Sequence, residues 1–199
     1  MSGAGARAPI EAAARLQAVQ APVIPVMGEM IRQTPGTLSL GQGMVHWGPP
    51  AEALEAARDA IGDSGLHAYG AMAGEPVLLE AVGRWLQQHH QLDLEGSAVL
   101  ISAGSNMAFH AVAQVLCDPG DECLLPVPYY FNHAMAIQLA GGVPVAVEAG
   151  VIPDPERLAA AITPRTKMVV SESPTNPHLS VVDCPKLAEI GRRRGVTTL

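Results

Sequence analysis

The chain has 199 residues, of which 48% are hydrophobic and 16% charged, so it can bury the core of one large domain. Its 19 acidic and 12 basic residues give a net charge of −7, which argues against a nucleic-acid partner because such partners require a basic surface. Its apolar runs are shorter than the roughly 18 residues that cross a bilayer, so no membrane partner is expected. The three cysteines and the histidines lack metal-site spacing, so no metal site is expected, and the cysteines are predicted to be reduced thiols in a cytoplasmic protein.

The first half of the chain is predicted to be helical. Apolar residues recur at helical spacing over residues 10–20, 23–33, 52–61 and 75–90. In the third of these stretches Pro50 suits a first helical turn and Gly62 can end the helix.

From residue 98 onwards, short apolar runs alternate with helical patterns. Strands are predicted over 98–102, 122–126, 143–148, 167–171 and 196–199, and helices over 106–116, 129–140, 155–162 and 185–194. Asp183 is placed to cap the last helix at its start, and Gly195 is placed to end it. This alternation predicts an α/β fold with a mostly parallel sheet and flanking helices.

The turn after the first predicted strand has the composition of a phosphate site. Gly104, Ser105 and Asn106 lead directly into a helix, whose first backbone N–H groups lie at the positive end of the helix dipole. Gly104 allows a ligand to approach closely, and the other two side chains add a hydroxyl and an amide. An ordinary strand–helix turn capped by Ser or Asn is the alternative.

Two more loops follow strands at the same edge of the predicted sheet. Residues 126–131 contain three adjacent aromatic residues, which can stack on a planar ring. Residues 174–177 hold Asn176 between two prolines, which restrict the backbone around it. In open parallel sheets ligands bind at the carboxyl ends of the strands, so both loops are candidates for a binding site. Core packing of the aromatic residues and a purely structural turn are the alternatives.

Taken in order, these segments resemble the class I/II aminotransferases, which are pyridoxal-phosphate enzymes of fold type I. The resemblance runs from about Leu38 to Leu199. The segments that carry it are Leu40–Gly43, Ala68–Gly70, Gly74–Pro76, Ser102–Asn106, Asp118–Glu122, Pro126–Tyr130, Ala140–Gly142, Ala161–Lys167 and Ser173–Pro177. It implies an N-terminal arm and part of a small domain over residues 1–48. Residues 49–199 would then be the N-terminal half of the large cofactor-binding domain, a truncated form of the family's α/β fold.

The resemblance also implies roles for individual residues. Pyridoxal 5′-phosphate is the expected cofactor, and an amino acid and a 2-oxo acid are the expected substrates. The cofactor phosphate would be held by Gly104, Ser105 and Asn106. Tyr130 would stack on the pyridine ring, and Asn176 would hydrogen-bond its phenolic oxygen and contribute to the substrate site with the backbone of Gly43. Tyr69 would reach the phosphate of a partner subunit, which implies a homodimer in the complete enzyme.

The sequence departs from the family pattern at several points. His178-Leu179 stands where the family usually has Thr-Gly, Ser173 where it usually has Asn, and Val45-His46-Trp47 where it usually has Pro-Asp-Phe. The lysine that forms a Schiff base with the cofactor is missing, because neither Lys167 nor Lys186 lies in a family-like context. The aspartate that pairs with the ring nitrogen and the family's arginines would lie beyond Leu199. No catalytic residue is therefore assigned to this chain, which is expected to be truncated and inert alone.

Other functions stay open at this point. The parent enzyme could instead catalyse another reaction of the same fold, as a β-lyase, an amino-acid oxidase-like enzyme or a cyclopropane-forming synthase. The chain could also be a non-catalytic subunit that pairs with a full-length paralogue. An unrelated phosphate-binding α/β module is a third alternative.

Overall fold

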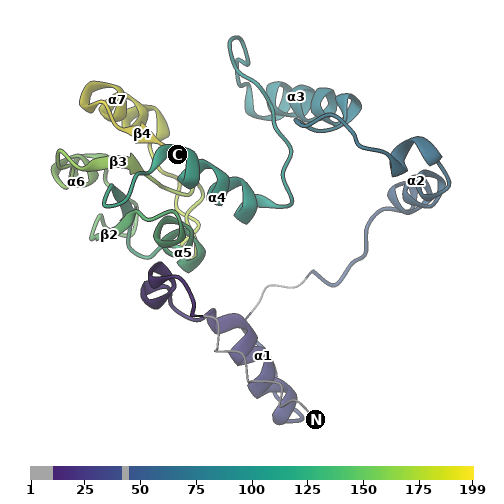
Figure 1. The fold of residues 1–199 in the computed structure, drawn as a ribbon, viewed down its shortest axis with the longest axis horizontal. Helices are drawn as coiled ribbons and strands as arrows, with labels where there is room; N and C mark the ends of the chain where they lie inside the picture. The colour runs from purple at the N-terminus through teal and green to yellow at the C-terminus, as the bar shows by residue number, and fades with distance from the viewer. Residues whose placement is uncertain (1–10, 42–44) are drawn as a thin grey trace, which may run out of the picture. The chain divides into compact units, whose positions relative to one another are not determined.

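The computed structural model describes residues 11–41 and 45–199, which form two compact units (Figure 1). One unit consists of Ala103–Leu199 and the described residues before Ala21, and the other of Ala21–Ser102. The predicted domain boundary between residues 48 and 49 concerns the domains of the complete family fold and stays a prediction.

The first unit is built on a sheet of four parallel strands in the order β2-β1-β3-β4. The strands are β1 (Glu122–Pro126), β2 (Val143–Val147), β3 (Thr166–Val169) and β4 (Thr197–Thr198). β1 pairs on both sides, and all five of its residues are buried, as its continuous apolar sequence predicts. The predicted α/β fold with a parallel sheet is therefore confirmed.

Helices cover both faces of this sheet. They are α4 (Ser105–Leu116), α5 (Phe131–Leu139), α6 (Pro155–Ala160) and α7 (Cys184–Arg194). Side chains along a strand alternate between faces, so Cys123 and Leu125 belong to a core cluster completed by α4 and α5. Leu124 belongs to a second cluster, to which α6 and α7 contribute Leu158 and Leu187. The result is a three-layer α/β/α arrangement in which β1 and β3 are the two inner strands of the sheet.

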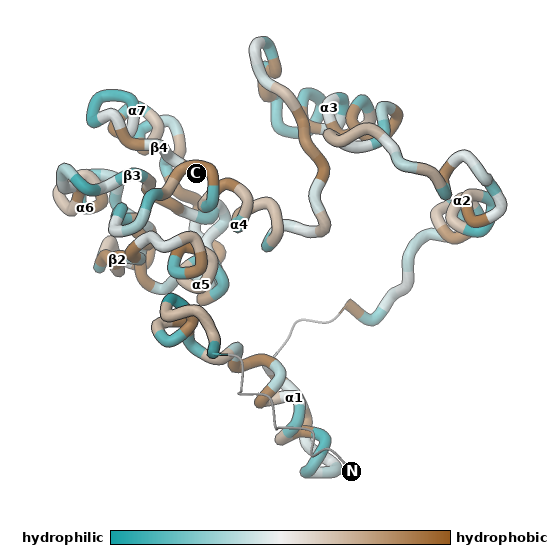
Figure 2. Tube along the Cα trace, viewed as in Figure 1, coloured by the Kyte–Doolittle hydropathy of each residue, from teal (hydrophilic) through white to brown (hydrophobic). Residues whose placement is uncertain are grey.

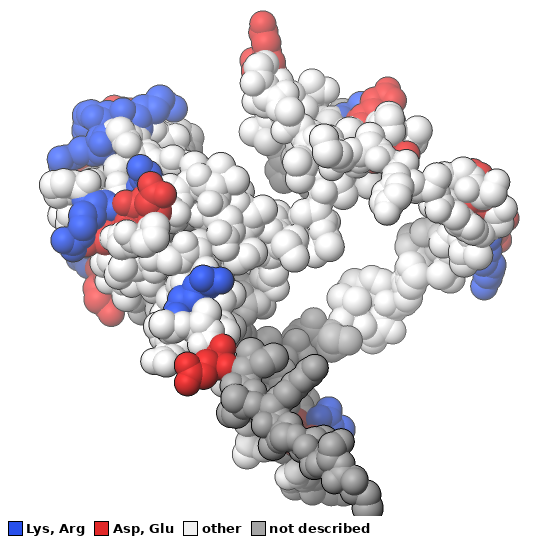
Figure 3. Space-filling view, in the orientation of Figure 1, with Lys and Arg blue, Asp and Glu red and all other residues white. Residues whose placement is uncertain are grey.

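The ends of α7 are stabilised as the sequence predicts. The Asp183 carboxylate accepts a hydrogen bond from the Lys186 backbone N–H at 3.0 Å, and Gly195 ends the helix with a φ of 68°. The last turn contains three consecutive arginines, Arg192–Arg194. Figure 3 shows basic side chains gathered over this helix, and cations at a helix C-terminus offset its dipole.

Two predicted elements are wrong. The predicted helix over 10–20 is, in its described part, only the 3-10 helix η1 (Ala14–Ala18), which has no side-chain cap and buries none of its residues. A helix this short gains too little to be stable as an α-helix. Residues 98–102 do not form a strand, because among the described residues no strand pairs with them. The Ile101 backbone N–H instead donates a hydrogen bond to the Ala73 carbonyl at 2.8 Å.

The second unit contains the remaining predicted helices. They are α1 (Val23–Gln33), α2 (Ala51–Ile61) and α3 (Pro76–His90), with the 3-10 helix η2 (Ser64–His67) after α2. Figure 2 shows apolar and polar residues alternating around the turns of α1 and α2, and none of the three α-helices has a buried residue. No helix within residues 11–41 and 45–199 has both the length and the apolar content needed to cross a membrane.

All three cysteines are free thiols. Cys117 follows α4 and Cys123 lies in β1, and their buried Sγ atoms are 3.3 Å apart. Burial and the neighbouring thiol raise the pKa of Cys123 far above its ordinary value, so this thiol stays protonated.

A buried carboxylate connects β1 to the loop before β3. Glu122 is 6% exposed, and its carboxylate accepts hydrogen bonds from the Thr163 hydroxyl and from Arg165, whose Nε atom is 3.0 Å away. The Thr163 hydrogen bond and then the Arg165 guanidinium hold the pKa of Glu122 below its ordinary value, against the opposing effect of desolvation. The ionised form therefore stabilises the folded chain.

We expect Glu122→Gln to destabilise the chain more at pH 7 than at pH 3. Because the folded-state pKa is depressed, the stabilisation is present above the unfolded-state pKa and is lost as the pH falls through the folded-state pKa. Urea unfolding followed by circular dichroism measures the free energy of unfolding at both pH values. Glu189→Gln, which changes an exposed carboxylate on α7, is the control. An equal loss at pH 3 and pH 7 would contradict the assigned role of the Glu122 charge.

Candidate functional site

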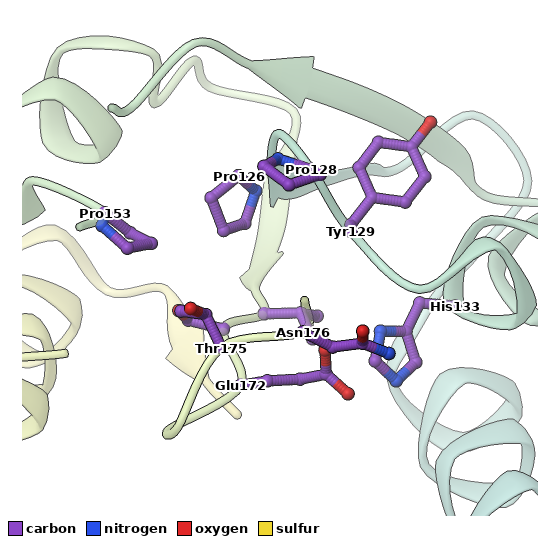
Figure 4. Close-up of a pocket in the computed structure, with 10 residues that line it drawn as sticks. Pro126, Pro128, Tyr129, His133, Pro153, Glu172, Thr175 and Asn176 are labelled. Atoms are coloured by element: carbon purple, nitrogen blue, oxygen red, sulfur yellow. The ribbon is translucent and has the colours of Figure 1, made fainter. Parts of the chain in front are cut away.

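A pocket lies where β1 and β3 end, at the carboxyl edge of the sheet (Figure 4). It is formed by the loops that follow these two strands, with contributions from α5 and from the segment between β2 and α6. The lining residues are Pro126, Pro128, Tyr129, His133, Pro153, Val170, Ser171, Glu172, Thr175 and Asn176. The structure therefore brings together the two loops that the sequence singles out at this edge.

Asn176 is held beside the pocket by a tightly hydrogen-bonded loop. The buried Thr175 accepts a hydrogen bond from the Ser180 backbone N–H at its hydroxyl, at 3.0 Å, and its own N–H donates to the Ser180 carbonyl at 2.9 Å. The Leu179 N–H donates to the Thr175 carbonyl at 2.7 Å. These three bonds close the loop around Asn176 and fix its position next to the pocket.

Tyr130 immediately precedes α5, and its neighbours fix its orientation. Its hydroxyl accepts a hydrogen bond from the Asn132 side-chain amide at 2.7 Å. The ring centroids of Tyr130 and His133 are 5.7 Å apart, with the two planes nearly perpendicular. The adjacent Phe131 ring makes a second edge contact with Tyr130, with the two ring centroids 5.0 Å apart. The Tyr130 ring thus contacts both the Phe131 and the His133 ring.

His133 joins the two loops. Its ring contacts Tyr130 and also Phe109 of α4, at a centroid distance of 4.4 Å, while it lines the pocket together with Asn176. Figure 4 shows the Asn176 and Glu172 side chains directed toward the His133 ring. Burial lowers the pKa of His133, and the Glu172 charge opposes this effect only in part, so the imidazole is neutral at pH 7.

The predicted phosphate turn begins α4. Gly104 precedes the helix with a φ of 85°, a conformation that glycine adopts without strain, and an added Cβ would have no atom within 4 Å. The α4 helix is 12 residues long, so Ser105 and Asn106 lie in the first turn of a substantial helix dipole. Asn106 lines a shallow groove with Asn132, the residue that hydrogen-bonds Tyr130. Asn132 therefore relates Asn106 to Tyr130, while Asn176 lines the separate pocket that contains His133.

Of the predicted cofactor residues, Asn176 lines the pocket, whereas Gly104, Ser105, Asn106 and Tyr130 are not among its lining residues. Two further predicted residues lie elsewhere. Gly43 lies outside the described residues, and Tyr69 belongs to the other compact unit, where its side chain is fully exposed. The Nζ atom of Lys167 is 3.9 Å from Asp121, and that of Lys186 is 3.2 Å from Glu156. Neither lysine lines the pocket. Among the residues that the structure describes, no group of three or more possible metal ligands comes together.

Comparisons with known proteins agree on one family. The model of the family "Aminotransferase class I and II" matches residues 35–199. An aromatic aminotransferase from Arabidopsis thaliana is 34% identical over 178 residues, which are 86% of this chain and 45% of the relative. An aspartate aminotransferase from Geobacillus stearothermophilus is 36% identical over 159 residues, covering 77% of this chain and 40% of the relative.

Solved structures agree with this result. The aspartate aminotransferase from Rhizobium meliloti superposes with a TM-score of 0.84 and 28% identity, over 95% of this chain and 50% of the other. The aspartate aminotransferase from Thermus thermophilus with maleate superposes with a TM-score of 0.83 and 31% identity, over 96% of this chain and 52% of the other. The chain belongs to the class I and II aminotransferase family. It spans about half the length of the family members that it matches.

The pocket has the polar groups that the family's cofactor needs. The buried Ser171 hydroxyl oxygen has no hydrogen-bond partner within the described residues, although it lines the pocket beside Asn176. A buried hydroxyl without a partner is costly, so a polar ligand atom would satisfy it. The apolar proline walls and the Tyr129 side chain suit a planar heteroaromatic group. The residues present therefore fit pyridoxal phosphate.

Sequence reasoning missed His133 and Glu172 as site residues. Both lack a recognisable motif, and only the fold places them in one pocket. Their positions in the sequence could have identified them. His133 follows Tyr130 by three residues in a predicted helix, and Glu172 comes directly after a predicted strand.

One departure from the aminotransferase pattern has a visible structural cost. Leu179, which stands where the family usually has Gly, adopts a φ of 55° in the loop that holds Asn176. A side chain in this left-handed conformation costs roughly 1–2 kcal/mol. The Leu179 side chain is 76% exposed, so it gains little packing to offset this strain.

We expect Leu179→Gly to raise the free energy of unfolding by about 0.5–1 kcal/mol, because relief of the strain exceeds the entropy cost of glycine in the unfolded chain. Urea unfolding measures the difference. Leu179→Ala is the matched control, since it removes the exposed side chain but keeps the Cβ atom and therefore the strain. If both variants gained equally, the side chain and not the backbone would be responsible.

Proposed function

We propose that the chain binds pyridoxal 5′-phosphate at the carboxyl edge of its sheet. We further propose that it forms part of an enzyme that transfers an amino group from an amino acid to a 2-oxo acid. The observation that carries this proposal is the convergence of the Tyr130 and Asn176 loops on one pocket through His133. The cofactor, when bound, supplies an electron sink for the amino acid.

The chain's own residues would bind and orient the cofactor. Backbone N–H groups at the start of α4, with Gly104, Ser105 and Asn106, would hold its phosphate. Tyr130, held by Asn132, would cover one face of the ring and exclude water from it. The Asn176 amide would donate a hydrogen bond to the phenolic oxygen. Asn176 and the backbone of Gly43 would also contact the substrate.

The remaining parts of the proposal concern the complete enzyme. A homodimer in which Tyr69 reaches the partner's cofactor phosphate is supported by the family resemblance. A cytoplasmic location is supported by the free thiols. Because each lysine pairs with a carboxylate away from the pocket, a non-catalytic subunit that joins a full-length paralogue is a second candidate function.

Gly104→Ala is expected to weaken pyridoxal phosphate binding at least tenfold, because a side chain at a positive φ distorts the turn that presents the N–H groups. Isothermal titration calorimetry with pyridoxal phosphate measures the affinity. Gly195→Ala, at the end of α7, is the matched control, since that glycine also has a positive φ and open space around its Cβ position. Equal affinities for the two variants would contradict the phosphate role of this turn.

The isolated chain is expected to show no turnover when mixed with pyridoxal phosphate, an amino donor and a 2-oxo acid. Proton transfer in this chemistry needs a positioned amine, and both lysines of the chain are engaged elsewhere. Formation of the amino-acid product, followed by chromatography, tests this expectation. Turnover that survives the double substitution Lys167→Ala/Lys186→Ala would rule out the role assigned to the missing lysine.

A further inference from the structure

Two of the three thiols face each other inside the core of the first unit. Cys117 directly follows α4, Cys123 is the second residue of β1, and their Sγ atoms are 3.3 Å apart. Both belong to the core cluster on one face of the sheet that also contains Leu125 and Ile137. Neither cysteine lines the candidate cofactor pocket, so the pair is separate from the site described above.

The turn between the two cysteines, residues 118–121, holds them in this position. The Asp121 backbone N–H donates to the Asp118 carbonyl at 3.1 Å, and the Asp121 carboxylate accepts a hydrogen bond from the Asp118 N–H at 3.0 Å. The Gly120 N–H donates to the Gly141 carbonyl at 3.1 Å, which ties the turn to the segment before β2. The two thiols are therefore kept together by the folded turn, and not only by their closeness in the sequence.

The distance between the two sulfur atoms suits a disulfide. An S–S bond is about 2.05 Å long, so the atoms have to approach each other by roughly 1.2 Å. Small rotations about the two Cα–Cβ bonds supply a movement of this size, so the backbone turn can stay in place. Among the described residues no group of three or more possible metal ligands comes together, so the protein does not complete a metal site around the pair.

The two thiols differ in their access to solvent. Cys117 is 8% exposed, whereas Cys123 is fully buried. Hydrogen peroxide is close to water in size, so it reaches the Cys117 sulfur first. Burial, and then the neighbouring thiol, raise the pKa of Cys123, which keeps its proton. Cys117 is thus the thiol that is oxidised first, and Cys123 carries a proton for the step that follows.

We propose that Cys117 and Cys123 are a site of reversible oxidation, at which a hydroperoxide converts the two thiols of the folded chain to a disulfide. The Cys117 sulfur attacks one oxygen of the hydroperoxide, the O–O bond breaks, and the Cys117 proton leaves with the departing oxygen, which gives a sulfenic acid. The Cys123 sulfur then attacks the Cys117 sulfur, the S–O bond breaks, and the Cys123 proton leaves with the hydroxide as water. Two electrons pass from the thiols to the hydroperoxide, and the new bond fastens the end of α4 to β1.

The test treats the folded 199-residue chain with hydrogen peroxide and locates the bond by mass spectrometry. The substitution Cys184→Ser is made first, because this exposed thiol on α7 could join two chains. Cleavage before aspartate separates the two cysteines, since Asp118 and Asp121 lie between them, and gives peptides 93–117 and 121–153. We expect these two peptides to be linked after oxidation and to separate again after treatment with dithiothreitol.

Urea unfolding followed by circular dichroism shows whether the fold accommodates the bond. We expect the oxidised chain to unfold at a higher urea concentration than the reduced chain, because the cross-link restricts only the unfolded state. Two controls carry a single thiol in the Cys184→Ser background. With Cys123→Ser, Cys117 should be oxidised to an acid that dithiothreitol does not reverse. With Cys117→Ser, the buried Cys123 should stay reduced. Neither control should be stabilised by peroxide.

Two results would overturn the proposal, and both come from the chain that retains the pair, so they do not depend on the stability of the single-thiol controls. Linked peptides that form in urea but not in the folded chain would show that the thiols serve core packing only. A linked chain that unfolds at a lower urea concentration than the reduced chain would show that the fold opposes the bond. Neither result bears on cofactor binding, because neither thiol lines the pocket.

Discussion

The parallel hydrogen-bond ladder around β1 is the constraint on which the candidate site depends. It continues past the strand ends, because the Val127 N–H donates to the Val147 carbonyl at 2.9 Å and the Val170 N–H donates to the Leu124 carbonyl at 3.0 Å. In a parallel sheet all strands point the same way, so the loops that follow them leave from one edge. The ladder therefore determines that the Tyr130 and Asn176 loops meet.

The sequence predicts the elements whose stability is local or whose burial is continuous. The bounds of β1 follow from a strand buried on both faces, and the ends of α7 follow from Asp183 and Gly195. Residues 98–102 show the limit of such reasoning. Their apolar run has the composition of a strand, but a strand forms only where a neighbour supplies backbone partners, and composition does not reveal whether one is present.

The same distinction applies to the site. Gly104, Tyr130 and Asn176 occur in loops with recognisable motifs, so sequence patterns identify them. His133 and Glu172 become site residues only because α5 and the β3 loop face the same pocket, a relation between residues 39 positions apart. The lowered pKa of His133 is a property of that neighbourhood and is not encoded in the residue alone.

The pocket wall contains three prolines: Pro126 at the end of β1, Pro128 in the loop that follows it, and Pro153 in the segment between β2 and α6. Proline restricts its own φ angle in the free chain as much as in a complex. These parts of the wall consequently have little conformational entropy to lose when a ligand enters. The cavity is thus preorganised, and recognition there should draw mainly on ligand desolvation and charge rather than on ordering of the protein.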